Sequence, residues 1–190
     1  MDLISQLRAF QPWNEQEDRD REALLRLLEN GQAFYGREDP AHLTTSAWVV
    51  SPDRDRVLLA YHNLYNSWAW LGGHADGERD LLSTALREVR EESGLENVRP
   101  VSRDIYSVEI LTVDGHEKRG RYVSSHLHLN VTFLLEADPA APVRRKADEN
   151  SAVAWFSLEE AVSASTEPWF RQRIYSKLNA KLAGFPPRRD

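Results

Sequence analysis

Three glutamates on one predicted helix have the spacing expected of ligands for a divalent metal ion. Glu88, Glu91 and Glu92 lie within the segment REVREE. At about 100° per residue they span roughly 100° of the helix surface beside its apolar arc, which places them where the helix meets the sheet. Arg87 can pair with Glu91 at four-residue spacing, yet one cation does not neutralise three carboxylates. The segment therefore favours a hard divalent ion, Mg²⁺ or Mn²⁺, which takes oxygen ligands.

Two glycines, Gly72 and Gly73, precede this helix across a short polar turn. Glycine lets the backbone approach a ligand closely, so a carbonyl of either residue could add a metal ligand. The alternative is that the arginine-glutamate run is a solvated, salt-bridged helix face, as most charge runs are. The glycines count against this alternative.

The wider pattern around the glutamates resembles the signature of the Nudix hydrolases. The matching positions are Gly73, Arg87-Glu88-Val89, Glu91-Glu92 and Gly94-Leu95. The resemblance implies an α/β fold, the Nudix α/β/α sandwich with a mixed β-sheet. It also implies Mg²⁺-dependent hydrolysis of the diphosphate bond in a nucleoside diphosphate linked to another moiety.

The resemblance also assigns roles to individual residues. It makes Arg87 the residue that orients the glutamates. One position departs from the family pattern, because Arg79 stands where the first glutamate of the signature falls and Glu78 lies one residue earlier. That glutamate is thought to support the start of the helix, so the departure concerns local salt bridging more than activity. The residues assigned to the metal are Glu88, Glu91, Glu92, Gly72 and Gly73.

A general base must also lie within reach of the attacking water. In this family the base is a glutamate of the signature, here Glu91 or Glu92, or a glutamate from a loop elsewhere. Glu149, in the loop before the last predicted strand, is the candidate outside the signature, and Glu117 is a weaker one. The alternative for Glu149 is a solvated loop acid.

Three histidines are candidate contacts to the substrate. His126 and His128 alternate with apolar residues and share one strand face, where they could contact phosphate or sugar or simply face solvent. A metal site built from these two lacks a third nitrogen or carboxylate at local spacing. His74 directly follows the glycines and could lie at the mouth of the cleft, or be an ordinary turn residue.

The remaining sequence predicts strands and helices interleaved in one α/β unit. Asp80 can cap the signature helix and Gly94 can end it in a left-handed conformation. In the strand predicted over 125–135, leucine, valine and phenylalanine alternate with polar residues, which predicts one core face and one polar face. The other expected elements are a helix at 15–30, strands at 42–50, 56–62 and 151–156, a charged loop at 116–121, an exposed loop at 138–148 and a helix at 169–182.

This order of elements predicts one domain overall. We expect an N-terminal helical extension packed on the core over residues 1–40, a Nudix domain over 41–185 and a frayed tail over 186–190. Many Nudix relatives dimerise, so this protein could form a homodimer. Either the N-terminal helix or the helix at 169–182 could form the dimer interface, and the sequence does not choose between them.

Composition excludes several classes of function. The 190 residues include no cysteine, which excludes disulfides and thiolate sites and fits a reducing cytoplasm. No stretch has the apolar length of a membrane span, so we expect a soluble cytoplasmic protein without a membrane partner. The net charge of −6 argues against a nucleic-acid binder, so the expected partner is a small nucleotide-diphosphate substrate.

Two other functions remain open. An isopentenyl-diphosphate isomerase shares the fold, but that enzyme uses a catalytic cysteine and this chain has none. A non-catalytic Nudix-fold module that binds a nucleotide or regulates a partner would not need all three glutamates. The sequence does not identify the diphosphate substrate.

Overall fold

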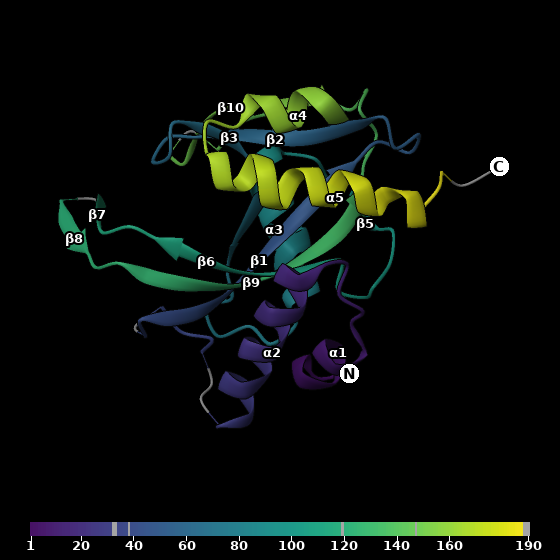
Figure 1. Cartoon of the computed structure of the whole chain (residues 1–190). Helices are drawn as coiled ribbons and strands as arrows, with labels where there is room; N and C mark the ends of the chain where they lie inside the picture. The colour runs from purple at the N-terminus through teal and green to yellow at the C-terminus, as the bar shows by residue number, and fades with distance from the viewer. Residues whose placement is uncertain (32–33, 38, 119, 147, 188–190) are drawn as a thin grey trace.

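The computed structural model describes residues 1–31, 34–37, 39–118, 120–146 and 148–187. These form a curled eight-stranded sheet flanked by helices, with a small separate hairpin (Figure 1). The helices are α1 (Leu3–Ala9), α2 (Glu15–Glu29), α3 (Leu81–Ser93), α4 (Leu158–Ala164), the π-helical turn η1 (Phe170–Tyr175), α5 (Ser176–Lys181) and the 3₁₀ turn η2 (Leu182–Gly184). The strands are β1 (Ala41–Val50), β2 (Arg56–His62), β3 (Ser67–Ala69), β4 (Leu71–His74), β5 (Arg99–Pro100), β6 (Ser107–Val113), β7 (His116–Lys118), β8 (Arg121–Val123), β9 (His126–Glu136) and β10 (Asn150–Ser157).

The sheet is mixed because its two long central strands run parallel. Its order is β10-β2-β1-β9-β5, with β3 paired to β2, β4 to β1 and β6 to β9. β1 and β9 are parallel over their whole length, from Ala41 opposite Leu127 to Val50 opposite Glu136, whereas the other pairs are antiparallel. The mixed sheet with helices on both faces confirms the predicted Nudix-type α/β/α sandwich.

Each face of the sheet carries its own hydrophobic core. On one face, Ala85 and Val89 of α3 pack with Leu43, Val49 and Phe133, and apolar residues of α1 and α2 extend this core. The other core joins apolar residues of β1, β2 and β9 to those of η1, α5 and η2. Figure 1 shows α5 crossing the sheet on one side with α3 behind it. The signature helix α3 thus packs against the sheet where β4 pairs with β1.

The N-terminal segment is held to the domain by buried charges. Glu17 of α2 is fully buried and its carboxylate contacts Lys181 at 2.7 Å and Lys177 at 3.2 Å. Lys177 also pairs with Glu109 of β6 at 2.9 Å. The helices at the two ends of the chain therefore meet at the β6 edge of the sheet. The division at residue 40 stays a prediction, and the tail predicted over 186–190 lies partly outside the described residues.

Several local expectations were wrong. The charged loop predicted at 116–121 contains the β7-β8 hairpin, which projects from the body in Figure 1, and α1 was not expected. The sequence predicted a polar, solvent-facing side for β9, but from Leu129 to Glu136 both faces are buried because helices cover them. Its polar residues Asn130 and Thr132 are buried and hydrogen-bonded to Glu109. The terminal helix begins with a π-helical turn.

Helices of the described residues were also searched for a membrane span. Not one of them combines the length and the apolar character that crossing a bilayer requires.

Candidate active site

The signature helix begins and ends as its sequence predicts. The carboxylate of Asp80 accepts a hydrogen bond from the backbone N–H of Ser83 at the first turn. Gly94 ends the helix at φ 71°, a left-handed conformation that glycine adopts without strain. The packing of Ala85 and Val89 into the core sets the rotation of α3, and the neighbouring acidic arc therefore reaches the junction with β4.

Two of the three signature glutamates are buried at this junction. Glu88 is 9% exposed and Glu92 is 5% exposed, whereas Glu91 faces solvent. The carboxylate of Glu92 is held by neutral donors, the backbone N–H of Gly72 at 2.9 Å and the side-chain amide of Asn150 at 3.2 Å. Burial raises the pKa of Glu92 to about 7. A cation that binds this carboxylate near pH 7 would therefore compete with a proton for it.

Gly73 makes room for Glu88. A Cβ atom at Gly73 would lie 2.6 Å from Cδ of Glu88, closer than real Cβ contacts allow. Burial raises the pKa of Glu88 against the opposing influence of Arg87, whose guanidinium lies 2.8 Å from that carboxylate. Arg87 also contacts Glu91 at 3.1 Å. The structure thus brings the predicted orienting arginine between two predicted metal ligands.

The loop before β10 contacts the acidic face of α3. Lys146 lies 2.8 Å from Glu149 and 3.6 Å from Glu91. The charge of Glu149 also contributes to the raised pKa values of Glu88 and Glu92, so its carboxylate shares their electrostatic environment. The loop predicted to be merely exposed therefore brings Glu149 beside the site, together with a lysine.

Glu78 and Arg79, which depart from the family signature, both make contacts near the start of α3. The carboxylate of Glu78 accepts hydrogen bonds from the backbone N–H groups of Arg79 and Asp80, at 2.7 and 2.9 Å. The guanidinium of Arg79 lies over the ring of Tyr35, 5.8 Å from its centre. Glu78 thus supports the start of the helix from one position earlier than in the family signature.

The histidines predicted to contact substrate gather in one place. His74, His126 and His128 lie with His42, and the ring centres within this group are separated by 5.0 to 5.1 Å in five of its pairs. Burial, followed by the charge of His74, lowers the pKa of His128 to about 2, so that this ring is neutral at pH 7. We call these four residues the histidine cluster.

One ion pair connects the acidic site and the histidine cluster electrostatically. Arg37 pairs with Asp76 in the turn between β4 and α3. The hydrogen bond to Asp76 raises the pKa of Arg37, and the charges of Glu88 and Glu149 add to this effect. The same guanidinium contributes to the lowered pKa of His128. The charge of Arg37 therefore acts on both groups of residues.

Sequence reasoning did not place three of these residues in the site. Asn150, which holds Glu92, and Lys146, which contacts Glu91, lie about 55 residues or more along the chain from α3. His42 joins the cluster because β1 and β9 are parallel and bring it opposite His128. No local spacing in the sequence signals such contacts.

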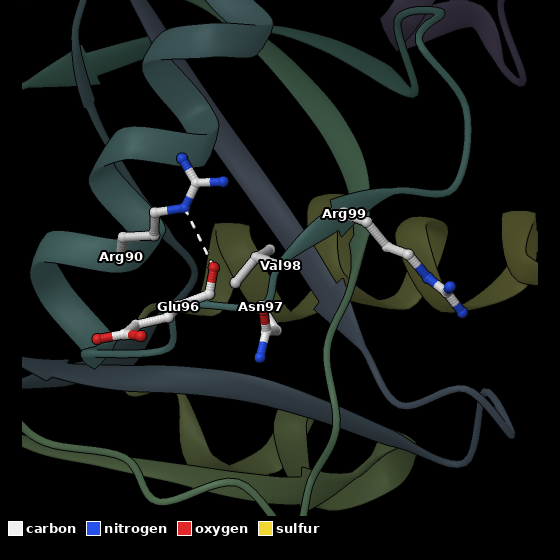
Figure 2. Close-up of a pocket in the computed structure, with 5 residues that line it drawn as sticks. All are labelled: Arg90, Glu96, Asn97, Val98 and Arg99. Carbon is white, nitrogen blue, oxygen red and sulfur yellow. Dashed lines mark hydrogen bonds between the residues drawn. The ribbon is translucent and has the colours of Figure 1, made fainter.

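A hollow of about 430 Å³ lies on the far side of α3 (Figure 2). Arg90, Glu96, Asn97, Val98 and Arg99 line it. Arg90 is two residues from Glu88, about 200° around the helix, so the hollow faces away from the acidic site. Figure 2 shows the side chain of Arg99 pointing away from Arg90, and Arg99 pairs with Glu136 at 2.5 Å. These two cations do not converge on a common ligand.

Comparison with known families settles the relationship suggested by the signature. The NUDIX domain matches residues 40–178, which is most of the chain. The chain belongs to the Nudix hydrolase family. Its signature segment, β4 with α3, is thus the Nudix box of this protein, and the match leaves α1 and α2 outside the family domain.

Two similar relatives carry the same name. This Nudix protein is 32% identical over 107 residues to the asymmetrical bis(5'-nucleosyl)-tetraphosphatase of Mus musculus and 30% identical to that of Rattus norvegicus. The match covers 55% of this chain and 65% of each relative. The similarity thus spans about two thirds of those enzymes and little more than half of this chain.

Solved Nudix structures share the fold at low sequence identity. A Nudix hydrolase from M. smegmatis aligns with a TM-score of 0.56 and 18% identity, covering 85% of this chain and 96% of its own. The dihydroneopterin triphosphate pyrophosphohydrolase of E. coli gives 0.53 and 18%, covering 76% and 97%. The Ap4A hydrolase of C. elegans gives 0.51 and 19%, covering 75% and 98%. These similarities show the shared fold.

Proposed function

We propose that this protein hydrolyses a diphosphate bond in a nucleotide substrate, with Mg²⁺ or Mn²⁺ held by the Nudix box. The observation that carries the proposal is the pair of buried carboxylates, Glu88 and Glu92, beside Gly72 and Gly73. Burying two glutamates side by side costs folding free energy, and Arg87 contacts Glu88 whereas the hydrogen bonds to Glu92 come from neutral donors. A bound divalent ion would offset the cost for both carboxylates.

The donor set suits a hard divalent ion. Glu88, Glu91 and Glu92 offer carboxylate oxygens, and Gly72 or Gly73 would add a carbonyl oxygen. Glu92 is held by two neutral donors and has a pKa of about 7, so it can give up its proton to bind a cation near neutral pH. When bound, the ion would neutralise diphosphate oxygens and lower the pKa of a bound water.

The protein residues then have separate tasks. The hydrogen bonds from Gly72 and Asn150 fix the carboxylate of Glu92 in one orientation. Arg87 holds Glu88 and Glu91 at a set separation. Together these contacts keep the oxygen ligands in place before substrate arrives, so that the reaction needs little reorganisation of the site.

Glu149 is our candidate general base. Its carboxylate is partly exposed and paired to Lys146 at 2.8 Å, and it shares the electrostatic environment of Glu88 and Glu92. A carboxylate at the edge of the site could accept the proton of the attacking water. Glu91, the exposed box glutamate, is the competing candidate. Glu149→Gln distinguishes them: if Glu149 is the base, the variant loses turnover by several orders of magnitude while its Mg²⁺ affinity stays unchanged, and if Glu91 is the base, the variant keeps most of its turnover.

The relatives point to a substrate class. Enzymes named as bis(5'-nucleosyl)-tetraphosphatases are 32% and 30% identical to this chain over 107 residues. A dinucleoside polyphosphate is a nucleoside diphosphate linked to another moiety, which is the class that the Nudix box favours. We therefore propose dinucleoside tetraphosphates as the first substrates to test. His74, His126 and His128 remain predicted contacts on the substrate side of the site.

The test is a hydrolysis assay of the full chain with Mg²⁺. Dinucleoside tetraphosphates, nucleoside triphosphates, nucleotide sugars and ADP-ribose are compared, and products are identified by mass spectrometry in ¹⁸O-labelled water. We expect label in a phosphate product. Glu91→Gln and Glu92→Gln should each lower turnover by several orders of magnitude while the protein stays folded. Glu22, a partly exposed glutamate on α2, supplies the matched control, and Glu22→Gln should leave turnover unchanged.

Two outcomes would contradict the proposal. The first is full turnover in both Nudix-box variants, which would place the chemistry elsewhere. The second is the absence of hydrolysis of every compound, together with nucleotide binding that Glu92→Gln leaves intact. That result would favour a non-catalytic nucleotide-binding module.

A further inference from the structure

Five of the six histidines of this chain gather where one end of the large sheet meets the β7-β8 hairpin. His42 lies near the start of β1, His74 ends β4 and His128 lies near the start of β9, and both β4 and β9 pair with β1. His126 lies two residues before His128, and His116 of β7 is 6.2 Å from His126. Such a concentration of imidazoles needs a physical reason, because neither hydrophobic packing nor solvation favours it.

We propose that His42, His74 and His128 form a second metal site, specific for a transition metal ion such as Zn²⁺. Each residue offers one ring nitrogen, and the three nitrogens lie within 4.8 Å of one another. Zinc binds histidine at about 2.1 Å, so tetrahedral ligands lie about 3.4 Å apart. Binding would draw the rings together by little more than about 1 Å. His74 and His128 are partly exposed and can move by that amount.

The environment of His42 supports this assignment. Its ring is 4% exposed, and its Nδ1 lies 3.1 Å from the backbone carbonyl of Asp39. Because a carbonyl only accepts, Nδ1 carries the proton and Nε2 keeps its lone pair. Within the described part of the chain, Nε2 is buried and has no hydrogen-bond partner. A buried nitrogen of this kind costs free energy, and a metal ion would satisfy it.

His126 acts as a positioning residue for His128. Its Nδ1 contacts the backbone carbonyl of Ser124 at 2.8 Å, so its Nε2 is an acceptor. That Nε2 lies 3.2 Å from Nε2 of His128 and fixes the orientation of the second ring. Metal-binding histidines are commonly held in this way by a hydrogen bond to the nitrogen that does not bind the ion.

The second site differs in chemistry from the Nudix box. Imidazole nitrogens suit Zn²⁺, Co²⁺, Ni²⁺ and Cu²⁺, whereas carboxylate oxygens suit Mg²⁺ and Mn²⁺. The two sites would therefore load different ions from one mixture. This inference does not depend on the proposed hydrolase activity, since it concerns binding alone.

The first test uses the unmodified full chain without a histidine tag. Titration with Co²⁺ should give visible absorption bands that saturate at one equivalent, and Zn²⁺ should displace them. X-ray absorption of the Zn²⁺-loaded protein should show three imidazole ligands. Fewer than three imidazoles around the ion, or no saturable Co²⁺ spectrum, would overturn the proposal. Neither measurement needs a variant that might misfold.

The second test identifies the ligands by substitution. His74→Gln and His128→Gln should each weaken Zn²⁺ binding more than about 10-fold, because even an outer-shell partner is worth that much. His62→Gln is the control, since this ring packs on Tyr65 in another part of the sheet. Glu92→Gln should leave Zn²⁺ binding unchanged. Equal affinity in the cluster variants, or Zn²⁺ binding lost in Glu92→Gln, would overturn the assignment. Circular dichroism verifies that each variant is folded.

Discussion

The side-chain amide of Asn150 donates a hydrogen bond to Oε1 of Glu92 at 3.2 Å. The contact joins the first residue of β10 to the last turn of α3, and both side chains are buried. It leaves Oδ1 of Asn150 buried and, among the described residues, without a hydrogen-bond partner. The protein thus leaves one buried polar oxygen unsatisfied beside the carboxylate that would bind metal.

Removing this amide should weaken metal binding. Asn150→Ala leaves one oxygen of Glu92 without its donor, so we expect a loss of about 1–3 kcal/mol in unfolding free energy and a 10- to 100-fold loss of Mg²⁺ affinity. Calorimetric titration and urea unfolding measure the two quantities. Asn179→Ala removes an amide that donates to the carbonyl of Leu158 at 2.7 Å, away from the box. This control should lose stability while its Mg²⁺ affinity stays unchanged, and equal affinities in both variants would count against the role of Asn150.

The raised pKa of Glu92 predicts how stability changes with pH in the metal-free protein. Below pH 4.5 the carboxyl is protonated in both the folded and the unfolded chain. Between 4.5 and about 7 the folded chain retains the proton longer, so stability falls as the pH rises through this window. The rise from 4.5 to about 7 corresponds to about 3 kcal/mol.

Glu92→Gln should abolish this contribution. In EDTA, we expect the variant to gain about 3 kcal/mol of unfolding free energy relative to wild type between pH 4.5 and pH 8. Urea unfolding at several pH values measures it. Glu91→Gln is the matched control, because Glu91 is exposed, and it should follow the wild-type pH dependence. Adding Mg²⁺ at pH 8 should stabilise wild type far more than Glu92→Gln. Parallel curves for wild type and Glu92→Gln would show that Glu92 does not titrate in this range.

A side chain at Gly73 should weaken metal binding by displacing Glu88. In Gly73→Ala the new methyl group would lie 2.6 Å from Cδ of Glu88 and force that carboxylate out of place. We expect metal affinity to fall about 10- to 100-fold with only a small change in stability, because Glu88 can rotate toward solvent. Mn²⁺ binding followed by electron paramagnetic resonance measures the affinity. Gly184→Ala, where a Cβ meets no atom within 4 Å, is the control. Unchanged Mn²⁺ affinity in Gly73→Ala would contradict the placement of Glu88.

Glu17 should matter far more for stability than a partly exposed glutamate on the same helix. Glu17→Gln leaves the buried ammonium of Lys181 without its carboxylate, which costs roughly 3–5 kcal/mol. Glu22 is partly exposed on α2 and lies 3.2 Å from Arg19, and its replacement by glutamine should cost less than about 1 kcal/mol. Urea midpoints compare the two. A loss below about 1 kcal/mol for Glu17→Gln would show that water reaches these charges.

Local sequence signals predicted the Nudix helix well. Asp80 and Gly94 mark its ends in the sequence, and both act as caps in the structure. The same reasoning failed for β9, where alternating leucines and polar residues predicted a solvent-facing side. Both faces are covered, and Asn130 and Thr132 are buried in hydrogen bonds. Alternation reports which residues differ in polarity, whereas burial depends on helices elsewhere in the chain.

Contacts between distant segments were beyond local reasoning. His126 and His128 lacked a third ligand at local spacing, yet His42 and His74 come from β1 and β4. The parallel pairing of β1 with β9 places His42 opposite His128, and no spacing rule encodes that register. Lys146 likewise reaches Glu91 only because its loop folds back across α3.

Glu17 and Lys181 are 164 residues apart in the chain, yet they share a buried ion pair. During synthesis, the carboxylate of Glu17 leaves the ribosome long before its lysine partner is made. An unpaired carboxylate resists burial, so we expect α2 to complete its docking only after the C-terminal helix has been made. Removal of the chain from Lys177 onward should likewise loosen α2, because Glu17 would lose both of its lysine partners.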